Sequence, residues 1–245
     1  MPSYVVTGTS RGLGLHEFIA GHTHKNVHVI EADSKDARAL RVNLKNAADT
    51  VSKITGGTLD VLINNAALMD YERVDLTLDA FPDAETLEAD LMLFFQTNTI
   101  GPIHTINAFL PLLLAGTTKK CLTISTTAGS PKVANATNFT TYGGYGISKA
   151  ALNLAIAKYA SRFRDDGVVF LAVTPGMVKT MPGTEEEVNK ALEPLVEKFR
   201  KRYPHFEGPI TVERSVRDIL VLLDRAGIAD SGKFTHRDGR DGDSI

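Results

Sequence analysis

The chain has 245 residues, of which 43% are hydrophobic and 23% charged, and its formal net charge is -2. This length suits one well-buried domain, and the charge provides no basic surface for nucleic acid or an anionic membrane. The single cysteine excludes an internal disulfide, no apolar run is long enough to span a bilayer, and the first residues lack the pattern of a signal peptide. We therefore expect a soluble, cytoplasmic protein that binds neither nucleic acid nor membrane.

The first predicted strand is short, and a glycine-rich segment follows it at once. Residues 4–7 read Tyr-Val-Val-Thr, and residues 8–14 read Gly-Thr-Ser-Arg-Gly-Leu-Gly. Glycines at this spacing permit a tight turn and the close approach of a ligand to the backbone. A helix that begins near Gly12 would direct free N–H groups toward a phosphate. The segment is interpreted either as a dinucleotide-binding loop or as a plain turn between strand and helix.

Two further strands are predicted, with one helix between them. The first covers 27–32 and ends at Asp33, an acidic residue about 20 positions after the glycines, where it could bind a ribose hydroxyl. Residues 36–54 have the apolar spacing of a helix, which a Gly-Gly pair ends. Residues 59–63 form the second strand and lead into 64–67, Asn-Asn-Ala-Ala. Polar and small residues at the carboxyl end of a parallel strand lie where open α/β sheets bind ligands.

A long helical region is predicted over 83–114, with a break expected at Gly101-Pro102. Asn98 lies inside this region, where asparagine competes for backbone hydrogen bonds. It either faces solvent, which is the more frequent case, or marks a kink that directs a polar group into a site. A buried strand over 120–125 then leads into hydroxyl-bearing residues, which serve a substrate oxygen or a turn equally well. Residues 130–141 are expected to form a loop.

Tyr145 and Lys149 are four residues apart in a helix predicted over 142–159, so they share one helical face. A lysine ammonium beside a phenol favours the phenolate and would lower the pKa of Tyr145 from about 10 toward neutral pH. A tyrosine tuned in this way exchanges a proton with an alcohol or carbonyl oxygen. Tyrosine and lysine at this spacing also occur in ordinary amphipathic helices, so the pair alone does not establish catalysis.

The last third of the chain continues the alternation of strands and helices. A strand over 168–173 is followed by a turn and by a helix that Thr184 and Glu187 begin as a capping box. This helix either covers a pocket or packs on the core. Thr211 caps a helix over 212–226, as its hydroxyl suits the first free N–H groups.

A last short strand is expected over 233–235, and the polar tail from Asp238 onward is expected to fray. The alternation throughout predicts one α/β domain over 1–245, with a doubly wound, mainly parallel sheet.

Several motifs, in this order along the chain, resemble those of the short-chain dehydrogenase/reductase family, and of its fungal carbonyl-reductase type. They are TGTSRGLG from Thr7, NNAA from Asn64, YGISK from Tyr145 and PGMVKT from Pro175, and Asn98 in NTIG matches the helix asparagine of the family. The match extends over nearly the whole chain. It implies a Rossmann fold and an NAD(P)-dependent oxidoreductase that interconverts a carbonyl and a secondary alcohol on a small, fairly apolar molecule, with NADP or NAD as cofactor and no metal. It also implies a homo-oligomer.

The resemblance implies a role for each matching residue. Tyr145 is the general acid/base, Lys149 lowers its pKa and binds the nicotinamide ribose, and Asn98 positions a water that relays protons to Lys149. Val178 and Thr180 contact the nicotinamide end of the cofactor. The implied cofactor-binding residues are Thr7, Gly8, Ser10, Arg11, Gly12, Leu13, Gly14, Asp33, Asn65 on the adenosine side, Ala66, Tyr145, Lys149, Pro175, Gly176, Val178 and Thr180.

The chain departs from the family pattern at its catalytic serine. That serine is usually the second of an Ile-Ser-Ser run, and here the corresponding position is Thr126. A threonine hydroxyl donates the same hydrogen bond, although its methyl group restricts rotation. Alternatively Ser125 takes the role through a shift of one residue, and the sequence leaves both open.

A larger departure is that one βα unit is missing between the glycine loop and NNAA. Either the strand ending at Asp33 is the second strand of the family, or, as we favour, it is the third. Arg11 favours a cofactor 2′-phosphate and Asp33 disfavours it through like-charge repulsion, so NADP and NAD both stay open. The shortening also raises an alternative function: a binding or regulatory protein on a reductase scaffold, or a non-redox isomerase or cyclase.

Overall fold

The computed structural model describes residues 2–8, 28–32, 37–69, 71–181 and 183–243. Within these ranges five strands form one parallel sheet, in the spatial order β1-β2-β3-β4-β5. The strands are β1 (Tyr4–Val6), β2 (Val61–Asn64), β3 (Lys120–Ile124), β4 (Val169–Thr174) and β5 (Phe234–His236). The predicted α/β class with a parallel sheet is confirmed. All five carboxyl ends meet at one edge of the sheet, which is where such sheets bind ligands.

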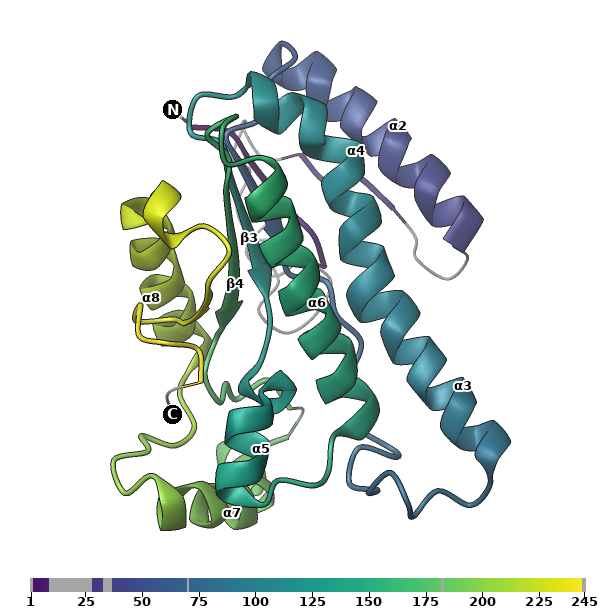
Figure 1. Cartoon of the computed structure of the whole chain (residues 1–245), viewed down its shortest axis with the longest axis vertical. Coiled ribbons are helices and arrows are strands. Elements are labelled where there is room, and N and C mark those ends of the chain that lie inside the picture. Colours follow the sequence, from purple (N-terminus) through teal and green to yellow (C-terminus); the bar gives the residue numbers. More distant parts are fainter. Residues whose placement is uncertain (1, 9–27, 33–36, 70, 182, 244–245) are drawn as a thin grey trace.

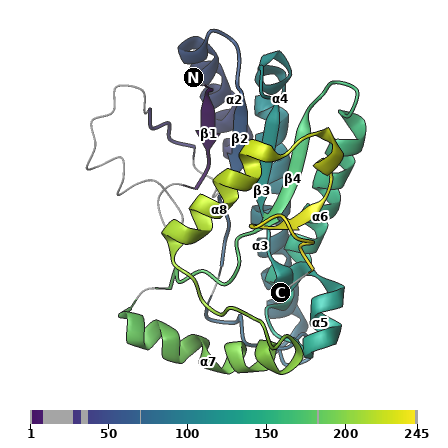
Figure 2. The ribbon, with the colours of Figure 1, turned by 90° about the vertical axis from the view of Figure 1, so that its left-hand side faces the viewer.

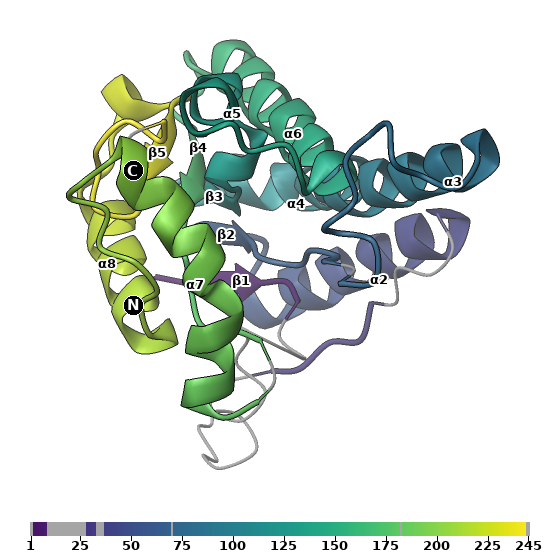
Figure 3. The ribbon, with the colours of Figure 1, turned by 90° about the horizontal axis from the view of Figure 1, so that it is seen from below.

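Helices cover both faces of the sheet (Figures 1 and 2). One face carries α2 (Ala37–Thr55), α4 (Gly101–Ala115) and α6 (Gly143–Arg162), and the other carries α8 (Val212–Arg225). The helix α3 (Ala84–Phe95) continues into α4 through a π-helical turn, Gln96–Ile100. Figure 3 shows that α7 (Glu185–Arg202) lies across the carboxyl end of the sheet, near the short α5 (Pro131–Thr137).

Apolar side chains fill the space between each face and its helices. On the first face α2 contributes a buried stripe with helical spacing, which is Leu44, Ala47, Ala48 and Val51. On the second face Ile219 and Leu222 of α8 pack on Val61 and Leu171 of the sheet. The whole of β4 is buried, as expected for a central strand of a parallel sheet. The sheet edge that carries the site therefore rests on a rigid, close-packed support.

The predicted strand over 27–32 is wrong for the residues that the structure describes. Residues 28–32 form no strand there, and β1, which pairs with β2 on one side, is the edge strand of the described sheet. Val29 is 64% exposed, and Ile30 is the residue of this segment that packs on the core. β-branched residues alone do not make a strand when the backbone has no neighbour to bond.

The expected loop over 130–141 also needs correction, since α5 occupies part of it. Ser130 caps this helix by accepting the N–H of Val133, Pro131 stands in the first turn, and Asn138 ends it with a left-handed φ of 52°.

The tail does not fray before residue 243, because Thr235 and Asp241 form a bridge and the N–H of His236 donates to the Arg240 carbonyl. In the described part of the chain, no helix combines the length and apolar character that crossing a bilayer requires.

Candidate active site

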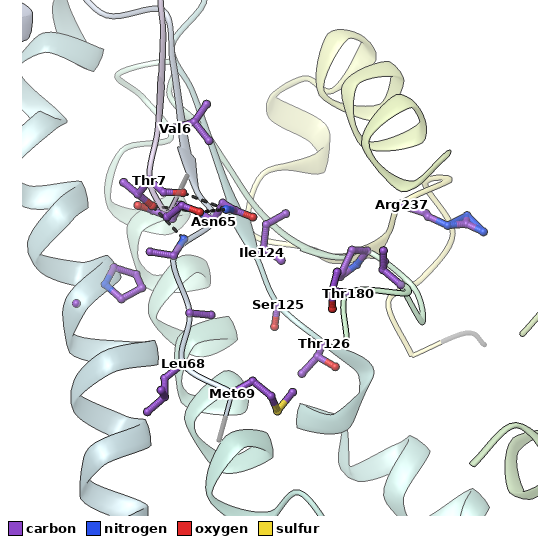
Figure 4. A pocket seen from close by; sticks show the side chains of 18 of the residues that line it. Val6, Thr7, Asn65, Leu68, Met69, Ile124, Ser125, Thr126, Thr180 and Arg237 are labelled. Carbon is purple, nitrogen blue, oxygen red and sulfur yellow. Dashed lines mark hydrogen bonds between the residues drawn. The ribbon is translucent and has the colours of Figure 1, made fainter. Parts of the chain in front are cut away.

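The turns that follow β1 and β2 hold each other at the carboxyl edge of the sheet (Figure 4). The side-chain amide of Asn65 donates to the carbonyls of Thr7 and Gly8, at 3.1 and 3.0 Å. In return the Thr7 hydroxyl accepts the N–H groups of Asn65 and Ala66, both at 3.1 Å. The structure thus brings these four predicted residues together. Ser10, Arg11, Gly12, Leu13, Gly14 and Asp33 lie outside the described residues.

Gly8 is the contact point between the two turns. Its φ of +69° is left-handed, and a Cβ built on it would overlap the Cα of Ala66. Only glycine accommodates both the conformation and this close approach. The first glycine of the predicted cofactor loop is therefore required by the packing of the second turn.

Tyr145 and Lys149 lie one turn apart on α6, as predicted. The Lys149 ammonium is 5.8 Å from the centre of the Tyr145 ring and donates to the Ile124 carbonyl at 2.8 Å. Lys149 is only 1% exposed, whereas Tyr145 is partly exposed and lines the cleft at the sheet edge. The lysine therefore supports the tyrosine from behind, and the tyrosine faces the ligand space.

The predicted lowering of the Tyr145 pKa is wrong for this arrangement. Burial raises the pKa of Tyr145 well above its ordinary value, and the neighbouring Tyr71 and Tyr142 raise it further. Burial also lowers the pKa of Lys149, from 10.5 to about 8. The ammonium bonds Ile124 rather than the phenol, so desolvation outweighs its attraction for a phenolate. Tyr145 is consequently protonated at neutral pH.

The two hydroxyls at the end of β3 have different surroundings, although both residues line the cleft (Figure 4). Ser125 is 1% exposed, and its hydroxyl donates to the Asn153 side chain on α6 at 2.6 Å. Thr126 is more accessible, and its oxygen accepts the N–H of Ala128 at 3.2 Å. An oxygen that accepts a bond leaves its own proton for another partner. Thr126 is therefore the freer donor of the two.

Asn98 lies at the π-helical turn and is completely buried, so the solvent-facing interpretation is wrong. Its side chain accepts the N–H of Leu68 at 2.7 Å and donates to the Leu68 carbonyl at 3.0 Å. It also approaches the Ser148 hydroxyl at 3.3 Å. The asparagine thus joins the segment after β2 to the helix that carries Tyr145, at a π-helical turn of the kind often found at functional sites.

Four predicted residues of the segment after β4 line the cleft: Pro175, Gly176, Val178 and Thr180. The segment is fixed from outside, because the N–H of Ile210 donates to the Met177 carbonyl at 2.8 Å and the N–H of Lys179 donates to the Ile210 carbonyl at 3.0 Å. The Ser215 hydroxyl of α8 donates to the Pro175 carbonyl at 2.9 Å. Three hydrogen bonds with residues outside the segment therefore fix this side of the cleft.

The helix α7 covers the cleft, which decides between the two interpretations of its sequence. Leu192, Leu195 and Phe199 line the cleft, and the predicted capping box at Thr184 is present. Glu185 at the start of α7 pairs with Lys179 at 2.8 Å. This ion pair thus connects α7 to the segment after β4.

The cleft has a volume of about 2130 Å³ and extends from the carboxyl ends of the strands along β1 to α2. Several of its residues could be expected from no motif, among them Phe139, Tyr142, His236 and Arg237. Arg237 pairs with Glu207 at 2.6 Å and with Asp218 at 3.1 Å. His236 and Arg237 follow the final predicted strand. Residues at the carboxyl ends of the other strands were predicted to bind ligands, so the same rule would have indicated these two.

Known proteins are similar in sequence to this chain. The family model for short chain dehydrogenases matches residues 17–191. The chain is 33% identical to the short chain dehydrogenase VirK of Hypocrea virens, over 98% of both chains, and 37% identical to the short-chain dehydrogenase/reductase AacuF of Aspergillus aculeatus, over 93% of this chain and 94% of the relative.

The chain belongs to the short-chain dehydrogenase/reductase family. Among solved structures, the carbonyl reductase Sniffer of D. melanogaster has a TM-score of 0.75 at 21% identity, over 98% of both chains. The NADPH-bound carbonyl reductase from chicken fatty liver has a TM-score of 0.72 at 23% identity, over 98% of this chain and 97% of that one. These two show the fold. The alignment with VirK has 274 positions against 245 residues here, so it contains gaps in this dehydrogenase/reductase.

This short-chain dehydrogenase/reductase is an NAD(P)-dependent oxidoreductase, and its described residues fit such a cofactor. Gly8 lines the cleft at the start of the glycine loop, where its backbone carries no side chain. The Lys149 ammonium has three N–H donors, of which one bonds Ile124 and two have no hydrogen-bond acceptor among the described residues. Gly8 and Tyr145, the neighbour of Lys149, both line the cleft.

Proposed function

We propose that this chain interconverts a carbonyl and a secondary alcohol on a small, fairly apolar molecule, with Tyr145 as general acid/base. The observation that carries the proposal is the position of Tyr145. Its ring faces the cleft at the carboxyl edge of the sheet, and a buried ammonium lies 5.8 Å behind it. A protonated phenol at a ligand cleft is suited to donate to a carbonyl oxygen.

The cofactor would be held along the strand ends. Thr7, Gly8, Asn65 and Ala66 would meet its adenosine and pyrophosphate side, while Pro175, Gly176, Val178 and Thr180 would meet its nicotinamide side. When bound, a nicotinamide cofactor supplies the hydride in the reducing direction and accepts it in the oxidising direction. The two free N–H donors of Lys149 would hold ribose hydroxyls.

The chain's own residues would handle the proton. Tyr145 donates to the substrate oxygen as negative charge develops there, and Thr126 donates a second hydrogen bond to the same oxygen. The raised pKa of Tyr145 keeps the phenol protonated at neutral pH, which is the form that donates to a carbonyl oxygen. The positive charge of Lys149 offsets part of the cost of the resulting phenolate. The side chain of Asn98 is occupied by Leu68, so a water held there for the proton relay would bond its main chain.

Substitution of Tyr145 by phenylalanine tests this function, because it removes one hydroxyl and keeps the ring. We expect Tyr145→Phe to lower turnover of a carbonyl substrate by about 10²–10⁴-fold. Its affinity for NADPH and NADH, measured by nicotinamide fluorescence, should stay within about twofold of the wild-type value, since the hydroxyl adds only one contact. Both cofactors are titrated, because Arg11 and Asp33, which would discriminate between them, lie outside the described residues.

Tyr159→Phe is the matched control, since Tyr159 is also on α6 but donates to Asn107 at 2.7 Å, on the neighbouring α4. A Tyr145→Phe enzyme that keeps most of its turnover would exclude the mechanism. Failure of the wild type to bind either cofactor at millimolar concentration would favour a scaffold protein without redox turnover.

A further inference from the structure

Six aromatic side chains form a continuous series from α3 to the cover of the cleft, and we call it the aromatic row. In order, its members are Phe94, Tyr145, Tyr142, Phe139, Phe199 and Phe206, and successive ring centres are 6.2, 6.5, 5.4, 5.8 and 5.3 Å apart. These separations lie in the range of favourable aromatic pairs. All members except Phe94 line the cleft. The row therefore forms a wall that begins at the proposed acid/base and ends beyond α7.

Apolar and sulfur-containing side chains complete this part of the cleft. Leu192 and Leu195 of α7 line it, as do Met69, Met177 and Met181. Methionine sulfur makes favourable contacts with aromatic rings and adapts to irregular shapes. A molecule with its carbonyl at Tyr145 would have the rest of its body against ring faces and edges, with thioethers around it.

Tyr142 occupies a backbone position that its side chain does not suit. Its φ of +61° and ψ of 34° are left-handed, a conformation that bulky residues rarely adopt. Two hydrogen bonds hold it there: its N–H donates to the Val74 carbonyl at 2.8 Å, and its carbonyl accepts the N–H of Gly146 at 2.7 Å. Glycine or asparagine would begin α6 with less strain. Strain of this kind persists at sites where the side chain has a function, and the Tyr142 ring stands next to Tyr145 in the row.

We propose that the substrate of this site is a flat aromatic ketone or the corresponding alcohol, with its ring system against the aromatic row and Tyr142 as the specificity-determining ring nearest the reacting oxygen. The inference rests on the proposed function and names its substrate class. A saturated molecule of the same skeleton buries apolar area equally well, but it has no ring quadrupole to match the edges and faces of the row. One such aromatic pair changes affinity by about two- to twelvefold beyond area burial.

The test compares two ketones with one carbon skeleton, methyl naphthyl ketone and methyl decalyl ketone, in steady-state kinetics with both reduced cofactors. The measured quantity is the ratio of kcat/KM for the aromatic ketone to that for the saturated one. Conjugation makes the aromatic ketone intrinsically slower to reduce, but this factor is the same for every variant and cancels when ratios are compared. The ratio therefore reports the contribution of the wall.

We expect Tyr142→Leu to lower this ratio about tenfold, mainly through KM for the aromatic ketone, as the loss of one ring pair predicts. Tyr142→Phe keeps the ring and should stay within about twofold of the wild type. Tyr203→Leu, which removes a ring at the end of α7 outside the row, should leave the ratio unchanged. Phe139→Leu provides a second loss from the row in case Tyr142→Leu does not fold, and we expect the same fall in the ratio.

The outcomes separate this inference from the proposed function. A ratio that neither Tyr142→Leu nor Phe139→Leu changes overturns the inference. Reduction of the saturated ketone with no measurable reduction of the aromatic one also overturns it, while the proposed function stands. If the wild type reduces neither ketone nor any other carbonyl compound with either cofactor, the proposed function fails and takes this inference with it.

Discussion

At the scale of single residues, Lys149 shows what the site requires of the fold. It is the largest side chain among the fully buried ones in the described part of the chain, and its ammonium has one acceptor there, the Ile124 carbonyl. Burial lowers its pKa from 10.5 to about 8, so at neutral pH the folded protein holds an incompletely solvated charge. An apolar side chain of similar length would stabilise this position better, as is often found for buried charges. The charge is thus a functional requirement that stability opposes.

This conflict predicts that Lys149→Met folds more stably than the wild type at pH 7, by about 1–3 kcal/mol. Below pH 8 lysine is protonated in both the folded and unfolded wild type, and the folded state carries the full burial penalty. Between pH 8 and 10.5 the folded state releases the proton first, so the wild-type free energy of unfolding rises with pH over this window. The advantage of the variant should therefore shrink from pH 8 to 10.5.

Urea titrations at several pH values measure both free energies of unfolding. Lys158→Met is the control, since Lys158 is exposed on the same helix, and we expect no comparable gain from it. An advantage of Lys149→Met that is absent at pH 7, or that does not depend on pH, would contradict the argument.

The hydroxyls of Ser125 and Thr126 have different hydrogen-bond partners, so we expect their substitutions to have different effects. Thr126→Val keeps the shape and removes the freer donor, so we expect kcat to fall about 10²-fold. The Ala128 N–H also loses its acceptor, which should cost about 0.5–2 kcal/mol of stability. Ser125→Ala leaves the Asn153 side chain without its partner at 2.6 Å, so it should cost about 1–3 kcal/mol of stability and change kcat only a few-fold. Kinetics and thermal unfolding of the two variants measure this. The reverse pattern would assign the catalytic hydroxyl to Ser125.

At the scale of elements, the contact between the turns after β1 and β2 depends on the missing side chain of Gly8. Gly8→Ala combines left-handed strain with overlap of the Ala66 backbone. Gly56 has nearly the same φ, +70° against +69°, but a Cβ there would meet nothing within 4 Å. Gly56→Ala therefore measures the strain alone, about 1 kcal/mol.

We expect Gly8→Ala to lose more stability than Gly56→Ala and to raise the Kd for its cofactor at least about tenfold, because the start of the glycine loop must shift. Chemical denaturation and nicotinamide fluorescence measure the two effects. Equal losses of stability in the two variants, with unchanged cofactor affinity, would show that the turns tolerate separation.

Elements with a regular apolar pattern could be predicted from the sequence, and those that depend on caps or partners could not. The stripe of α2 and the capped starts of α7 and α8 are local signals, and the structure confirms them. The seven residues of α5 have no stripe to read, and Ser130 and Asn138 define the helix only through their cap geometry. Residues 28–32 have strand-forming side chains but pair with no strand of the described sheet, and side-chain preference alone does not show whether a ladder forms.

The residues of the site also divide into those that the sequence could predict and those that it could not. Asn65 could be placed at a strand end and Tyr145 near the start of a helix from the order of elements and the motifs. The aromatic row could not, because Phe139, Phe199 and Phe206 come from separate segments that meet only when α7 covers the sheet edge. The direction of the Tyr145 pKa depends on burial, and the Tyr-Lys spacing carries no information about burial.

At the scale of the whole molecule, apolar side chains remain exposed on the helices that the resemblance assigns to assembly. They are Met92 (55% exposed), Leu93 (43%) and Phe95 (37%) on α3, and Ile147 (48%) and Leu154 (62%) on α6. The two helices pack side by side in Figure 1. Exposed apolar residues gathered on adjacent helices are typical of an interface. We infer that this surface joins copies of the chain into a homo-oligomer.

A mass measurement by light scattering tests the assembly. We expect the wild type to be at least a dimer, and Leu154→Glu to shift it toward the monomer, since a buried charge at an interface is costly. Val42→Glu is the matched control, because Val42 is 54% exposed on α2 rather than on α3 or α6, and it should leave the mass unchanged. A monomeric wild type would refute the inference.

The chain has six tyrosines and no tryptophan, and three of the six, Tyr71, Tyr142 and Tyr145, line the substrate side of the cleft. In the near ultraviolet, indole bands usually mask those of phenol, and here they are absent. The tyrosine bands of the circular dichroism are therefore visible, and because half of the tyrosines stand at the cleft, ligand entry should change them without any attached label.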